Sequence, residues 1–85
     1  MPAAAREQVS ARTAGALARR VREVVSRYSN LPDAIVRAQC RGIGRDPEQL
    51  TRRDLAKLAE RIGQAVEMFT DAQRGAEAAS LIRGL

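Results

Sequence analysis

The residues that most often carry out acid–base, nucleophilic or metal chemistry are nearly absent from this 85-residue chain. It contains no histidine and a single cysteine, Cys40. A cysteine nucleophile needs a neighbouring group that lowers the pKa of its thiol, and histidine is the usual base. We therefore interpret Cys40 as a small buried apolar residue, and we expect neither a metal ion nor a cofactor.

The carboxylates are too widely spread to predict a catalytic pair. Glu60, Glu67, Asp71 and Glu77 follow one polar face of an expected helix, which is typical of a solubilising surface. Paired carboxylates act as general acid and base inside a concave pocket, and a helical chain of this size seldom forms one. The residue types and their spacing therefore predict a protein that is not an enzyme.

Composition predicts one small domain with a thin core. Many of the hydrophobic residues are alanines, and the chain has one Phe and one Tyr. Scaffolds of this size often gain stability by association, so we expect a homo-oligomer. No apolar run approaches the roughly 20 residues that span a bilayer, so we expect no membrane association. The single cysteine and the lack of a signal-peptide core predict a cytoplasmic protein.

The positive charge is concentrated in the first half of the chain. The formal net charge is +5, with +6 on residues 1–45 and −1 on residues 46–85. Arginine greatly outnumbers lysine, which is typical of a GC-rich bacterial coding bias. The positions of the arginines are therefore more informative than their number.

Residues 1–7 are small and Ala-rich, and we expect a flexible N-terminal segment ahead of a single helical domain over 8–85. Apolar residues at three-and-four spacing predict an amphipathic helix over about 8–28. Basic residues lie on its opposite side, and Glu23 lies among them, spaced for i,i+4 pairs. We interpret this side as a surface for an acidic partner protein, with a nucleic acid as the alternative. The residues expected to bind are Arg12, Arg19, Arg20 and Arg27.

Helix-capping residues divide the rest of the chain. Asn30 predicts the start of a short helix over about 31–41, and Gly42 its end. The sequence Asp46-Pro47-Glu48-Gln49 combines an N-cap, a proline at the first helical position and a capping-box residue. It predicts a long helix over about 47–83. The expected fold is an all-α, three-helix hairpin-like domain that completes its core by self-association.

The predicted helix over 47–83 would be longer than the predicted helix over 8–28. The apolar residues in the part that extends beyond the shorter helix would therefore have to be buried by another surface. We expect a self-association seam that includes Ile62, Val66 and Phe69. Three further aliphatic residues lie off this stripe, at Leu81, Ile82 and Leu85. They either fold back after a bend at Gly75 or dock onto a partner, and we favour docking because the neighbouring alanines are strong helix formers.

Residues 55–75 resemble the helix-turn-helix family in one respect. Ala59 and Gly63 stand four residues apart as in that motif, and Gly63-Gln64-Ala65 would be its turn. The resemblance implies DNA binding by the following helix. Glu67 and Asp71 on that helix would repel phosphates, and a single continuous helix is the competing interpretation.

These patterns predict a small cytosolic adaptor or assembly module that binds another protein and has no catalytic activity. The alternative is a basic DNA-binding regulator. Such a regulator would use the Arg face of the first helix or a degenerate helix-turn-helix at 55–75.

Overall fold

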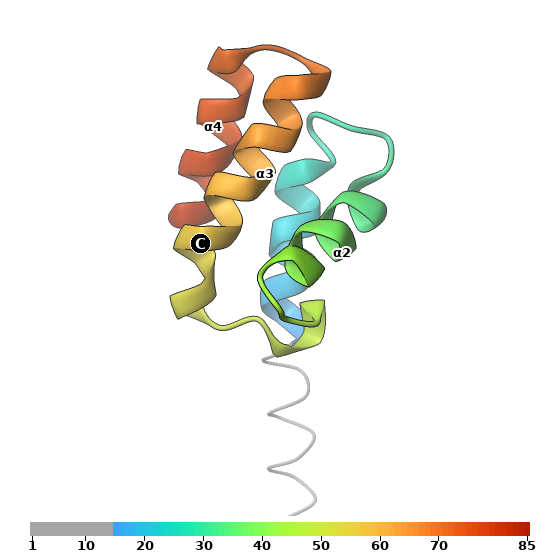
Figure 1. The fold of residues 1–85 in the computed structure, drawn as a ribbon, viewed down its shortest axis with the longest axis vertical. Helices are drawn as coiled ribbons and strands as arrows, with labels where there is room; N and C mark the ends of the chain where they lie inside the picture. The colour runs from blue at the N-terminus through green and yellow to red at the C-terminus, as the bar shows by residue number, and fades with distance from the viewer. Residues whose placement is uncertain (1–14) are drawn as a thin grey trace, which may run out of the picture.

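The computed structural model describes residues 15–85, which form four α-helices and no strand (Figure 1). The N-terminal helix is described over residues 15–25. The expected flexible segment 1–7 and the predicted binding residue Arg12 lie outside the described residues. The all-α fold class is confirmed.

Three more helices and two short 3-10 turns follow the N-terminal helix. Helix α2 spans Pro32–Gly42, and the turns η1 and η2 span Pro47–Gln49 and Arg52–Asp54. Helix α3 spans Leu55–Phe69 and α4 spans Ala72–Arg83. Helices α3 and α4 lie side by side and run in opposite directions, while α2 and the N-terminal helix pack beside α3 (Figure 1).

The core is built from apolar residues of all four helices. The largest fully buried side chains are Leu58 and Ile62 of α3, Ile82 of α4, and Val21 and Val25 of the N-terminal helix. Helix α2 contributes Val36 and Cys40. Most of the apolar face of α3, including Ile62 and Val66, is therefore covered within one chain, whereas Phe69 at its end stays exposed.

The prediction of one helix over 47–83 is wrong at its start. The side chain of Asp46 makes no capping hydrogen bond, and Pro47 begins a single 3-10 turn. Leu50 then leaves the helical conformation, with φ of −59° and ψ of 132°, and is buried in the core. The helical path restarts at Thr51, whose backbone N–H donates to Asp54 Oδ2 at 2.9 Å. Burial of Leu50 thus interrupts the predicted helix. The helical conformation resumes at the capping contact between Thr51 and Asp54.

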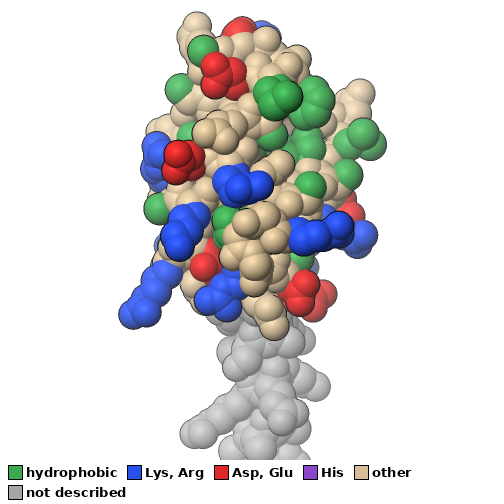
Figure 2. All heavy atoms as spheres, in the orientation of Figure 1, with side chains coloured by type: hydrophobic (Ala, Val, Ile, Leu, Met, Phe, Trp, Pro, Cys, Tyr) green, Lys and Arg blue, Asp and Glu red, His purple; other side chains and the backbone are tan. Residues whose placement is uncertain are grey.

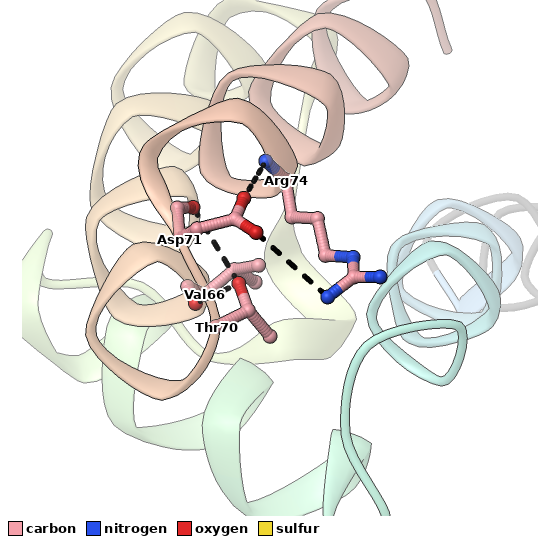
Figure 3. A network of polar contacts seen from close by, with 4 residues as sticks. All are labelled: Val66, Thr70, Asp71 and Arg74. Carbon is pink, nitrogen blue, oxygen red and sulfur yellow. Dashed lines mark hydrogen bonds and ion pairs between the residues drawn. The ribbon is translucent and has the colours of Figure 1, made fainter.

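The same helix is also broken near its middle, at Thr70 and Asp71 (Figure 3). The hydroxyl of Thr70 donates to the Val66 carbonyl at 2.7 Å and ends α3. Asp71 is the N-cap of α4, and its carboxylate accepts the backbone N–H of Arg74 at 2.8 Å. The chain therefore folds back at Thr70–Asp71, four to five residues before the alternative bend expected at Gly75.

Helix α2 matches its predicted range to within one residue, but both of its caps differ from the prediction. Its N-cap is Leu31, and the side chain of Ser29 accepts the Leu31 backbone N–H at 3.0 Å, where Asn30 was expected to cap. At the other end Gly44, with φ of 73°, has the left-handed conformation. The backbone N–H groups of Gly44 and Arg45 donate to the carbonyls of Arg41 and Cys40, which is a Schellman motif.

Candidate protein-binding groove

An open groove lies between the N-terminal helix and the C-terminal turn of α4. Its volume is about 250 Å³, and its lining consists of Arg20, Glu23, Val24, Arg27, Leu81 and Leu85. Arg20, Glu23 and Val24 lie three and four positions apart on one face of the N-terminal helix, and Arg27 lies in the turn that follows Val25. Leu81 and Leu85 form the opposite, apolar wall. The groove thus has one charged side and one aliphatic side.

The structure brings four of the predicted partner-binding residues to this groove: Arg20, Arg27, Leu81 and Leu85. Arg19 is exposed but does not line it. Ile82 is fully buried in the core, so it cannot contact a partner in this structure. Because α4 folds back onto α3, Ile82 packs in the core, whereas Leu81 and Leu85 line the groove at the surface.

The charged wall of the groove retains unpaired arginines. Among the described residues, neither Arg20 nor Arg27 has a carboxylate partner within 4.0 Å, and the expected i,i+4 pairs of Glu23 do not form. Arg22, on the side facing α2, does pair, with Arg22 Nη1 at 3.2 Å from Asp33 Oδ1. The groove arginines are therefore available to an acidic group from outside the chain.

Arg52 is a residue of this region that sequence reasoning missed. Its Nη1 donates to the main-chain oxygen of Leu85 at 2.8 Å. This hydrogen bond fixes the backbone at the end of the aliphatic wall and so positions the Leu85 side chain. The two residues are 33 positions apart, and no local pattern in the sequence predicts their contact.

The predicted self-association seam is divided by the fold. Ile62 and Val66 are buried within the single chain, so a seam built from them is not available in this structure. Phe69 is 69 % exposed, and its neighbour Met68 is 85 % exposed.

On the face drawn in Figure 2, hydrophobic side chains gather at the upper right and most basic side chains lie over the lower half.

The predicted helix-turn-helix is not present at the expected place. Helix α3 continues through Gly63-Gln64-Ala65, which would have been the turn. Gly63 is buried where α3 meets α4, so its small size permits a close helix contact. The antiparallel arrangement of α3 and α4 also differs from the steep crossing of a helix-turn-helix.

Cys40 is buried, and burial raises the pKa of its thiol to about 11, with a smaller contribution from the negative charge of Asp54. Such a thiol is a poor nucleophile near neutral pH. Within residues 15–85, no group of three or more His, Cys, Asp or Glu residues is placed to hold a metal ion. None of the helices in this part of the chain has the length and apolar character needed to cross a membrane.

A second, more polar hollow of about 180 Å³ lies where α2 ends. Its lining consists of Arg37, Arg41, Arg45, Asp46 and Pro47. Arg37 Nε lies 3.3 Å from Asp33 Oδ2, and Arg45 Nε lies 3.5 Å from Asp54 Oδ1. These carboxylates, with Asp46 in the lining, offset much of the positive charge. The groove beside α4 is therefore the stronger candidate site.

No protein-family model matches this sequence, and no curated protein and no solved structure matches it either.

Proposed function

We propose that this chain is a small helical protein–protein interaction module, of the adaptor or assembly type, that acts in the cytosol without catalysis. The observation that carries the proposal is the groove in which Arg20 and Arg27 face Leu81 and Leu85. An aliphatic wall suits a protein segment with an apolar side and acidic residues next to it when it stands beside two guanidinium groups that have no carboxylate partner among residues 15–85.

A nucleic acid is less well suited to this surface. Glu23 lies between the two arginines along the chain and lines the same groove, and its carboxylate would repel a phosphate backbone. The groove lining contains no aromatic residue on which a base could stack. These two features favour an acidic protein partner over DNA.

Site-specific photo-crosslinking tests the proposal. A photoreactive residue in place of Leu81 should crosslink to a protein partner in an extract of the native cell. The same residue in place of Gln73, which is exposed elsewhere on α4, is the matched control and should not. Charge reversal of Arg20 and Arg27 should remove the Leu81 crosslink while the far-ultraviolet circular dichroism stays unchanged.

Two results would overturn the proposal. One is the absence of any protein crosslink from Leu81. The other is submicromolar binding of random-sequence duplex DNA with an affinity that falls steeply as salt rises, since counterion release gives that dependence.

A further inference from the structure

The charged side of the groove spans seven positions of the chain, from Arg20 in the N-terminal helix to Arg27 in the turn that follows it. Its charges alternate along this length, from Arg20 through Glu23 to Arg27. A helix that fits it should present two acidic residues seven positions apart, with a hydrogen-bond donor between them.

Helix α3 of the chain itself carries this pattern on its surface. Glu60, Gln64 and Glu67 are all exposed and are spaced four and three apart, so they lie on one face of α3. Among residues 15–85, neither glutamate has a basic partner within 4.0 Å. We call these three residues the acidic stripe.

We infer that the occupant of the groove is the acidic stripe of a second copy of this chain, which rests on the groove being a protein-binding surface as proposed above. With the two helices antiparallel, Arg20 faces Glu67 and Arg27 faces Glu60. The same register places the amide of Gln64 opposite the carboxylate of Glu23. In a parallel arrangement Glu23 would face Gly63, which is buried, so the antiparallel register is the better match.

An apolar contact accompanies the ion pairs. Met68 follows the acidic stripe directly and is 85 % exposed in the single chain. In the antiparallel register it lies opposite position 19, next to the Arg20 end of the groove. Methionine adapts its shape to irregular apolar surfaces, which suits an open groove of this kind.

The groove and the acidic stripe are different surfaces of one chain. Each copy therefore offers both halves of the contact, and head-to-tail addition of copies gives a ring if the rotation between copies closes and an open filament if it does not. The charge asymmetry of the sequence supports this contact, since residues 1–45 carry +6 and residues 46–85 carry −1.

Charge reversal on each side of the contact tests the inference by sedimentation velocity of the full chain. The wild type should associate as concentration rises, and less so at high salt, because ions screen exposed charge pairs. R20E/R27E places acids in the groove against acids on the stripe, and E60R/E67R places bases against bases. Each variant should raise the concentration for half-association by more than about tenfold.

An equimolar mixture of the two variants is the decisive sample. The acidic groove of one then meets the basic stripe of the other, so association should return to near the wild-type level. E48R and R53E alter exposed charges on η1 and η2, outside the groove and the stripe, and they should leave association unchanged. Circular dichroism of every variant confirms that it is folded.

A wild type that stays monomeric at all concentrations, or a mixture that fails to associate, overturns the inference. Association that survives both charge reversals also overturns it. These results are distinct from failure of the proposed function, because a monomeric chain whose Leu81 position crosslinks to a different protein retains the groove as a binding site.

Discussion

Gly63 of α3 and Gly75 of α4 face each other, and neither has a side chain to hold the two backbones apart. A Cβ atom on Gly75 would lie 2.6 Å from the Gly63 carbonyl oxygen and 2.9 Å from Glu67 Cβ. No real Cβ approaches a backbone oxygen that closely. The pair of glycines therefore sets the distance between α3 and α4.

Gly75→Ala should lower the free energy of unfolding by about 1 to 3 kcal/mol, because the two helices must move apart to admit the methyl group. Gly84→Ala is the matched control on the same chain end, since a Cβ there meets its nearest atom at 3.6 Å. Urea denaturation of both variants measures the difference. An unchanged midpoint for Gly75→Ala would show that the α3–α4 contact is looser than described.

Asp71→Ala should lower the free energy of unfolding by about 1 kcal/mol through loss of an N-cap hydrogen bond. Asp46→Ala is the control, because Asp46 also stands before a helical turn but its side chain makes no capping bond. Thermal melts monitored by circular dichroism compare the two. A larger loss in Asp46→Ala would mean that the sequence-based capping interpretation was right after all.

Ile82→Ala should destabilise the protein by about 2 to 5 kcal/mol, since it leaves a cavity in the core. Leu81→Ala, at a side chain that is 37 % exposed, should have a much smaller effect on unfolding while weakening partner binding. Phe69→Ala should also change stability little, because that ring is mostly exposed. Equal denaturation midpoints for Ile82→Ala and Leu81→Ala would contradict the observed fold-back of α4.

The carboxylate of Asp54 should make the free energy of unfolding depend on pH in the acidic range. Its carboxylate accepts the backbone N–H of Thr51, and this hydrogen bond above all lowers the pKa of Asp54 below the ordinary value of 3.8. A lowered pKa in the folded state stabilises the protein above pH 3.8, and that contribution is lost as the pH falls through the folded-state pKa. Asp54→Asn should therefore be less stable than the wild type near neutral pH.

Urea denaturation at neutral and acidic pH measures this effect, with Asp46→Asn as the control. The difference between Asp54→Asn and the wild type should shrink as the pH falls below 3.8. A difference that stays constant across this range would show that the Asp54 charge does not stabilise the fold.

The sequence predicted the helical class and the position of α2 because three-and-four spacing and a proline at a helix start are local signals. It failed to predict where the long segment breaks. Asp46 was predicted to be an N-cap and Asp71 to lie within a helix, whereas the packing of Leu50 and the fold-back of α4 make Asp71 the residue that caps. A bend at Gly75 was the less favoured alternative, and in the structure Gly75 lies inside α4, where it admits the backbone of α3.

The candidate groove was predicted in part. Periodicity placed Arg20 and Arg27 on the exposed side of one helix, and the off-stripe position of Leu81 and Leu85 marked them as unusual. Their meeting in one groove depends on the turn at Thr70–Asp71, which reverses the chain direction. The hydrogen bond from Arg52 to Leu85 and the complete burial of Ile82 depend on the same reversal.

The burial of Cys40 gives the chain a built-in reporter of helix detachment. Its thiol is enclosed between α2 and the rest of the core, and with a pKa of about 11 only about one thiol in ten thousand is ionised at neutral pH. A thiol reagent can reach it only while α2 is lifted off or the whole chain is open. The labelling rate in the native buffer therefore measures how often that opening occurs, and its dependence on urea separates local detachment from global unfolding.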